Sequence, residues 1–151
     1  ENIGLPKPEI LSRKKQVVQE LNLNYLLGRS LFDLSGGEKQ KIVIARAVAQ
    51  TTPWMLLDEP IASLDIKNQI EIMQTLSELN RQEGVSVLMV LHDINLAGIY
   101  CDRLIMLKDG QVIAAGNTNE CLCEENLKKL YDISFFHMDT KKGQRYYYAE
   151  I

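Results

Sequence analysis

The 151-residue sequence has no long apolar run and no excess of positive charge. A bilayer-spanning helix needs roughly 20 apolar residues in succession, so we expect any attachment to a membrane to come through a protein partner. The 17 Lys and Arg residues are outnumbered by 20 Asp and Glu, for a net charge of -3, whereas contact with a nucleic-acid backbone relies on a basic surface. We therefore expect no nucleic-acid partner.

Cysteine is scarce too. Cys101, Cys121 and Cys123 are an odd number, and neither a second cysteine pair nor a histidine stands at metal-ligand spacing from them. The pattern favours a reducing, cytoplasmic compartment over a disulfide framework. A metal clip at Cys121 and Cys123 would lack the third and fourth ligands that such sites need, so we interpret this spacing as incidental.

The order of apolar and polar residues predicts a single α/β domain, for which this length suffices. Apolar residues recur at helical spacing over 9–27, 36–50 and 66–82. Gly28 ends the first helical stretch and Gly84 closes the last. We expect one or two short helices in the first stretch and one helix in each of the others.

Two short apolar runs, at 54–57 and 85–91, are typical of strands buried on both faces of a parallel sheet. Because a helix connects them, a right-handed crossover would place both strand ends at the same edge, where open α/β sheets bind ligands. Asp58 and Glu59 follow the first strand and His92 follows the second. We therefore expect two carboxylates and one imidazole to converge.

Residues typical of turns indicate where hairpins and short helices begin and end in the C-terminal third of the chain. Asp109-Gly110 is the strongest hairpin signal. Three successive tyrosines at 146–148 would allow stacking on a base, but we favour packing within a strand-rich tail. The expected elements are a helix over 94–100, a hairpin over 103–115, a turn at 116–117, a helix over 124–131 and a second hairpin over 135–151.

A serine followed by two glycines stands where the helix over 36–50 begins. Ser35 is suited to cap this helix, and the unpaired N–H groups of a first helical turn bind anions such as a terminal phosphate. The pair Asp58-Glu59 suits phosphoryl transfer, since one carboxylate can hold Mg²⁺ through water while the next deprotonates the attacking water. Histidine changes charge near physiological pH, so His92 suits the sensing of a phosphate or a water.

The main phosphate-binding loop of nucleotide enzymes is absent from this sequence. No stretch fits G-x-x-x-x-G-K-[ST], the loop whose backbone N–H groups wrap the phosphates and whose Lys meets their charge. The chain thus carries candidate catalytic residues without the main phosphate cradle.

Several stretches resemble the second half of an ATP-binding cassette (ABC) ATPase. Residues 34–49 resemble the signature motif and its helix, and 55–60 resemble the Walker B strand with its catalytic Glu. Residues 63–65 resemble the D-loop, and His92 with Asp93 resembles the switch histidine. The resemblance implies an α/β fold: a partial P-loop NTPase domain with parallel core strands, the end of a helical subdomain and C-terminal β-hairpins.

This resemblance also implies ATP and Mg²⁺ as cofactors and a role for each candidate residue. Glu59 is the general base, His92 contacts the γ-phosphate and Asp58 holds the metal. The signature motif of one subunit closes over ATP bound to a second subunit, and the D-loop runs along that interface. The implied nucleotide-binding residues are Ser35, Gly36, Gly37, Glu38 and Asp65.

The string His-Asp-Ile-Asn-Leu-Ala at 92–97 is similar to ATPases of importers for iron-siderophores, haem or vitamin B12. The implied function is ATP hydrolysis that drives uptake of such a metal chelate. The implied partners are a second ATPase subunit, in a homodimer, and integral membrane permease subunits at the cytoplasmic face of the cell membrane. The resemblance assigns 1–34 to the end of the helical subdomain, 35–116 to the signature, Walker B, D-loop and switch regions, and 117–151 to a C-terminal extension.

In this family the Walker A loop, the adenine-stacking aromatic residue and the Q-loop glutamine precede the signature motif, and Gln16 and Gln19 lie in the wrong context for a Q-loop. We therefore expect a C-terminal portion of a longer ATPase that cannot hydrolyse ATP alone. Two alternatives stay open. One is a non-transport ABC ATPase of DNA repair or chromosome maintenance, although no heptad coiled coil is visible. The other is a non-catalytic half-cassette that lends its signature motif to a partner.

Overall fold

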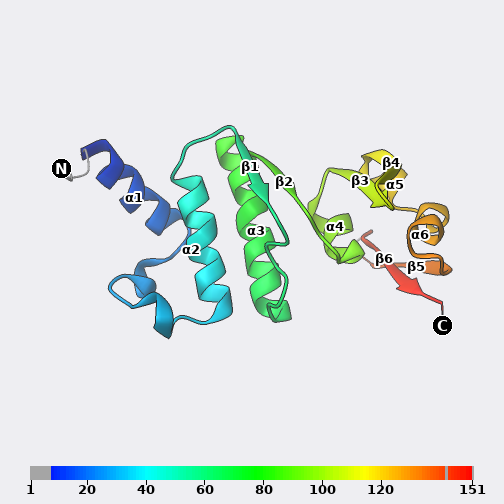
Figure 1. The fold of residues 1–151 in the computed structure, drawn as a ribbon, viewed down its shortest axis with the longest axis horizontal. Coiled ribbons are helices and arrows are strands. Elements are labelled where there is room, and N and C mark those ends of the chain that lie inside the picture. Colours follow the sequence, from blue (N-terminus) through cyan, green and yellow to red (C-terminus); the bar gives the residue numbers. More distant parts are fainter. Residues whose placement is uncertain (1–7, 142, 151) are drawn as a thin grey trace. The chain divides into compact units, whose positions relative to one another are not determined.

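The structure is a computed structural model that describes residues 8–141 and 143–150. The chain divides into two compact units, Glu1–Val90 and Leu91–Ile151, and each is described by itself (Figure 1). Lys142 and Ile151, which fall within the expected second hairpin, lie outside the described residues. The expectation of one domain with three segments stays a prediction.

The first unit is mainly helical. A side-chain cap begins its second and third long helices, at Ser35 and Asp65. The third helix ends at Gly84, whose φ of +68° is left-handed. The helices expected over 36–50 and 66–82 are confirmed. The helical elements are α1 (Pro8–Glu20), two 3-10 turns (Asn24–Leu26 and Leu31–Asp33), α2 (Gly36–Val48) and α3 (Ile66–Glu83).

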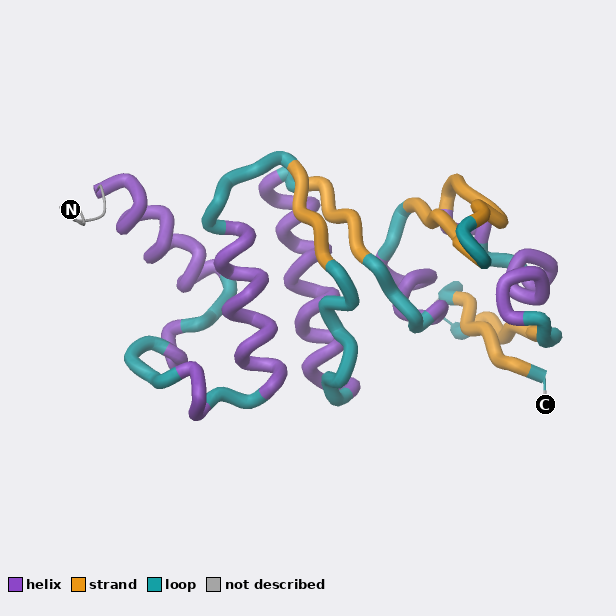
Figure 2. The backbone as a smooth tube through the Cα atoms, viewed as in Figure 1, coloured by secondary structure: helices purple, strands orange, loops and turns teal. Residues whose placement is uncertain are grey.

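Strands β1 (Trp54–Leu57) and β2 (Ser86–Met89) form a two-stranded parallel sheet with α3 as the connection between them (Figure 2). Each residue of β1 has a partner in β2, in register along both strands. A further backbone bond from Val90 N to Leu57 O, at 3.0 Å, continues the pairing past β2. The parallel pair expected from the sequence is confirmed.

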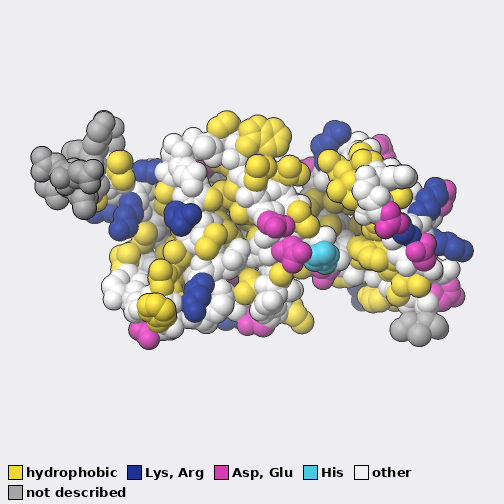
Figure 3. Space-filling model, viewed as in Figure 1, with side chains coloured by type: hydrophobic (Ala, Val, Ile, Leu, Met, Phe, Trp, Pro, Cys, Tyr) yellow, Lys and Arg dark blue, Asp and Glu magenta, His cyan; other side chains and the backbone are white. Residues whose placement is uncertain are grey.

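The expected burial of this sheet on both faces is wrong. Met55 is 5% exposed, but its neighbours Trp54 and Leu56 are 61% and 73% exposed. On β2, Leu88 is likewise exposed. Alternate residues of a strand point to opposite faces, and the described part of the chain supplies a covering layer on one face alone. Hydrophobic side chains therefore reach the surface of the first unit (Figure 3).

A core of aliphatic side chains holds the first unit together. Arg13 ties α1 to this core, because its Nη2 donates to Glu83 Oε2 at 2.9 Å and to Val48 O at 3.4 Å. A smaller cluster of Leu23, Leu26 and Leu34 lies around the 3-10 turns. The main buried side chains from α2, β1 and α3 are Ile44, Val48, Met55, Ile72, Met73, Leu76 and Leu79.

The second unit contains two antiparallel hairpins with short helices between and before them. Its core consists of Met106, Cys121, Leu122, Leu127 and Tyr147. The helices expected over 94–100 and 124–131 and both hairpins are confirmed. The elements are α4 (Ile94–Tyr100), β3 (Arg103–Lys108), β4 (Gln111–Asn117), α5 (Thr118–Cys121), α6 (Glu124–Tyr131), β5 (Phe135–Asp139) and β6 (Arg145–Ala149).

The expected turn at 116–117 is wrong. Gly116 and Asn117 are the last residues of β4, where they pair with Leu104 and Arg103. Pairing across the hairpin outweighs the local turn preference of these two residues. The one-turn helix α5 follows at once, and the sequence did not predict it because four residues are too few to show a helical period.

The packing interpretation of the tyrosines is confirmed for Tyr147, which is 4% exposed. Its hydroxyl donates to Leu122 O, and its backbone N donates to Asn95 Oδ1 at 2.8 Å. Tyr148 stacks on Phe136, with ring centroids 5.5 Å apart.

Within residues 8–141 and 143–150, no three His, Cys, Asp or Glu side chains are grouped in a way that could hold a metal ion.

Candidate active site

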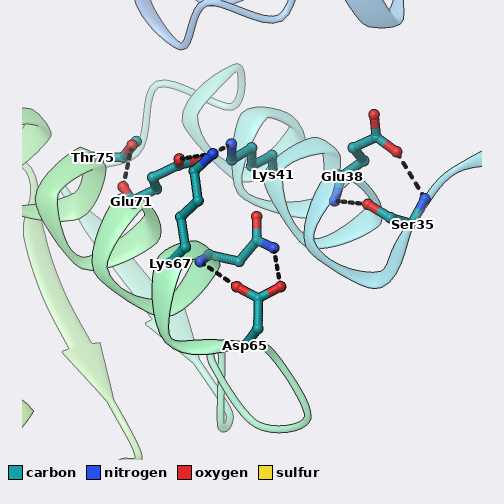
Figure 4. A network of polar contacts seen from close by, with 8 residues as sticks. Ser35, Glu38, Lys41, Asp65, Lys67, Glu71 and Thr75 are labelled. Atoms are coloured by element: carbon teal, nitrogen blue, oxygen red, sulfur yellow. Dashed lines mark hydrogen bonds and ion pairs between the residues drawn. The ribbon is translucent and has the colours of Figure 1, made fainter.

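The N-terminus of α2 presents two adjacent backbone N–H groups. Ser35 Oγ accepts from Glu38 N at 3.2 Å, and Glu38 Oε2 accepts from Ser35 N at 2.8 Å, which forms a reciprocal capping box (Figure 4). The N–H groups of Gly36 and Gly37 have no acceptor within the helix, because no helical residue precedes them by four positions. This turn therefore offers two donors to an anion.

The carboxylate of Glu38 lies beside these donors, and its charge is balanced. Hydrogen bonding from the Ser35 backbone, assisted by the Arg29 guanidinium, lowers the pKa of the Glu38 carboxyl below its ordinary value. Arg29 Nη1 lies 2.9 Å from Glu38 Oε1, and Arg29 Nη2 donates to Asp33 O at 3.0 Å. Glu38 is thus ionised but paired with a cation, which lessens its repulsion of a bound anion.

Asp65 caps α3 with both of its carboxylate oxygens. Oδ1 accepts from Asn68 N at 2.9 Å and Oδ2 accepts from Asn68 Nδ2 at 2.8 Å (Figure 4). The backbone bond from Asn68, followed by the side-chain bond, lowers the pKa of the Asp65 carboxyl. Asp65 is therefore an ionised helix cap at the D-loop position.

Asp58 and Glu59 follow β1 directly, as expected, and both are exposed. Glu59 has a φ of +44° and Ser63 a φ of +62°, left-handed conformations that are costly for residues with side chains. Between them, Pro60 and Ile61 are buried, so core packing holds the strained segment in place. Strained backbone of this kind is concentrated at functional sites, which supports this segment as a candidate site.

His92 belongs to the second unit, where it stands just before α4. Asp93 fixes the start of that helix, because its Oδ1 accepts from Asn95 N at 2.8 Å and from Leu96 N at 2.9 Å. The expected convergence of His92 with the two carboxylates after β1 stays a prediction, since those carboxylates belong to the first unit.

The structure does bring the signature residues and the D-loop residue to neighbouring helix ends. A Cβ added at Gly36 would lie 3.8 Å from Leu64 Cδ2, and one added at Gly37 would lie 2.6 Å from Asn68. Sequence reasoning missed Asn68, because its contact with Gly37 exists only after the helices pack. Its place three residues after a capping Asp is the signal that could have found it.

These residues suit ATP and Mg²⁺ as ligands. Backbone N–H groups at a helix start match phosphate oxygens in charge and geometry. Mg²⁺ is usually bound by one or two carboxylates together with phosphate oxygens and water, and Asp58 offers one carboxylate in an exposed position. The candidate donors and acceptors therefore fit the cofactors that the motifs imply.

Comparisons with known proteins point to one family. The ABC transporter family profile matches residues 2–62. The chain is 41% identical to an uncharacterised ABC transporter ATP-binding protein of Methanocaldococcus jannaschii over 121 residues, which cover 80% of this chain and 47% of that protein. It is 39% identical to the ferric enterobactin transport ATP-binding protein FepC of Escherichia coli K12 over 124 residues, or 82% of this chain and 46% of that protein.

Solved structures agree with these matches. A metal-chelate type ABC transporter in an inward-facing conformation matches with a TM-score of 0.91 and 28% identity, over 100% of this chain and 61% of that one. CbiO1 of Clostridium perfringens, part of an ABC transporter complex, matches with a TM-score of 0.73 and 31% identity, over 85% of this chain and 51% of that one.

The fold and the motifs match those of ABC proteins. The chain belongs to the ABC transporter family, and its relatives include ATP-binding subunits of haem, siderophore and cobalamin importers. It spans about half the length of the curated relatives it matches. The resemblance read from the motifs is confirmed, and the DNA repair or chromosome-maintenance alternative is not favoured.

Proposed function

We propose that this protein is the ATP-binding subunit of an ABC importer, in which ATP hydrolysis drives uptake of an iron-siderophore, haem, cobalamin or related metal chelate. The observation that carries the proposal is the capped Gly36-Gly37 turn, whose two N–H groups suit a terminal phosphate. The relatives include ATP-binding proteins for the transport of hemin, ferric enterobactin and petrobactin. These relatives support transport as the function and a metal chelate as the cargo.

The proposed residues divide the chemistry of hydrolysis among them. Asp58 holds Mg²⁺, which supplies positive charge against the phosphates when it is bound. Glu59 accepts a proton from the attacking water while the water oxygen bonds to phosphorus and the bond to the leaving diphosphate breaks. His92 donates a hydrogen bond to the γ-phosphate, where the N–H groups of the signature turn add further stabilisation.

The proposed assembly pairs this chain with a second ATPase subunit and with membrane permeases at the cytoplasmic face. In that dimer, Ser35, Gly36, Gly37 and Glu38 close over ATP that the partner's phosphate loop holds, and Asp65 lies along the shared interface. No helix in the described part of the chain is long and apolar enough to cross a membrane.

The test measures phosphate release from Mg-ATP by the native assembly that contains this chain. Glu59→Gln keeps the size of the side chain but removes the base, so the turnover number should fall by about 100-fold or more. The matched control is Glu78→Gln, which neutralises an exposed carboxylate on α3 and should leave turnover within about twofold. A wild-type assembly without activity contradicts the proposal, as does a Glu59→Gln assembly as fast as the control.

A further inference from the structure

The first turn of α2 rests directly on the first turn of α3, and the side chain of Asn68 forms the contact. A Cβ added at Gly37 would lie 2.6 Å from both Cγ and Oδ1 of Asn68 and 3.0 Å from its Nδ2. Real Cβ atoms do not approach other heavy atoms so closely, and Gly37 itself is buried. Position 37 therefore accepts no side chain while Asn68 keeps its place.

Asn68 keeps that place because Asp65 holds it. Its backbone N and its Nδ2 both donate to the Asp65 carboxylate, at 2.9 and 2.8 Å. Hydrogen bonds to an ionised carboxylate are stronger than those between neutral groups, and they fix the plane of the Asn68 amide. One side of that amide is thus tied to the D-loop residue, while the amide as a whole abuts the signature glycine.

A second contact keeps the two helices together one turn further along. Lys41 Nζ of α2 bonds Glu71 Oε2 of α3 at 2.5 Å, and within α3 the hydroxyl of Thr75 donates to Glu71 O at 2.8 Å (Figure 4). The Lys41–Glu71 ion pair thus favours the same approach of the two helices, and a change in the shape of Asn68 acts first on Gly37 and Asp65, the residues that Asn68 contacts.

We propose that Asn68 is a positioning residue that sets where the Gly36 and Gly37 N–H groups stand relative to the Asp65 cap. This inference rests on the proposed function, because those N–H groups are the ones that meet the γ-phosphate. Misplacement of a reacting group by about 1 Å can cost about 100-fold in rate. The Asn68 side chain, which separates the first turns of α2 and α3, should therefore affect the turnover number.

The first experiment compares single variants in the native assembly at saturating Mg-ATP. Asn68→Asp keeps the shape of the side chain but replaces the Nδ2 donor with an acceptor and sets two carboxylates against each other. Asn68→Ala removes the amide group that contacts Gly37. Both should lower the turnover number about tenfold, whereas Lys67→Ala, an 85% exposed neighbour on the same turn, should stay within about twofold.

A second experiment separates positioning from a merely structural role. Gly37→Ala alone drives its new methyl into Asn68 and should lower turnover about 100-fold. The double variant Gly37→Ala, Asn68→Ala has room for that methyl, so its turnover should return to within about threefold of Asn68→Ala alone. A residue that only adds stability would make the double variant slower than either single variant.

The outcomes distinguish this inference from the proposed function. A wild-type assembly that releases no phosphate overturns the proposed function and the inference with it. An active wild type in which the two Asn68 variants match Lys67→Ala, or in which the double variant loses the product of the single losses, overturns the inference alone. Circular dichroism of each variant shows that the fold is kept, and Asn68→Asp carries the test if Asn68→Ala does not fold.

Discussion

Two capping carboxylates make the stability of the first unit depend on pH. The backbone bond from Asn68 lowers the pKa of Asp65, and the backbone bond from Ser35 lowers the pKa of Glu38. A carboxyl whose pKa is lower in the folded chain stabilises the fold above its unfolded pKa and loses that contribution as the pH falls through its folded pKa. The free energy of unfolding should therefore decline as the pH drops below about 4.

Glu38→Gln isolates one of these two contributions. Gln is a weaker acceptor for Ser35 N and carries no charge for Arg29, so at neutral pH the variant should unfold at lower urea concentration than the wild type. The difference should shrink at an acidic pH low enough to protonate Glu38 in the folded chain, because the wild type then loses the same charge. Urea titrations at the two pH values measure the difference, and one that is equally large at both contradicts the role of the ionised cap.

Helix α3 ends at a glycine in a left-handed conformation. Gly84 has a φ of +68°, and nothing lies within 4 Å of a Cβ added there, so a side chain at this position is opposed by backbone conformation and not by crowding. Gly84→Ala should lower the free energy of unfolding by about 1 kcal/mol, and Gly84→Asn by less, because Asn tolerates left-handed geometry.

Chemical denaturation followed by circular dichroism measures these two variants against Gln82→Ala, an exposed change in the last turn of α3. The control should remain close to the wild type. A Gly84→Ala chain as stable as the control would mean that the left-handed geometry does not determine where α3 ends.

Helices and strands could be predicted from the sequence wherever the capping residue, the spacing of apolar residues and the residue that ends the element all indicate the same element. For α3 the signals are Asp65 before it, the apolar residues within it and Gly84 after it. Ser35 and Asp58 were predicted as candidate site residues for the same reason, since each stands at an element end, whereas Asp65 was assigned through the resemblance of 63–65 to the D-loop. Asn68 was not found, because its role depends on a neighbour far away in the sequence, and only the packing of two helices brings that neighbour close.

For the molecule as a whole, the exposed sheet face in the first unit is the main departure from the sequence prediction. All four residues of β1 are apolar, so no alternation in the sequence distinguishes a strand buried on one face from a strand buried on both. Whether β1 is buried on one face or on both depends on how many layers of other elements cover the sheet. That number follows from the packing of all the elements together and not from the residues of the strand. Met55 faces the core, while Trp54 and Leu56 do not.

A pair of lysine substitutions on adjacent residues of β1 tests this one-sided sheet. Met55→Lys places a charge among the core side chains and should lower the free energy of unfolding of this chain by about 3 kcal/mol or more. Leu56→Lys exchanges a 73% exposed side chain and should change it by about 0.5 kcal/mol at most. Urea unfolding followed by circular dichroism measures both. Comparable losses at the two positions would contradict the one-sided sheet.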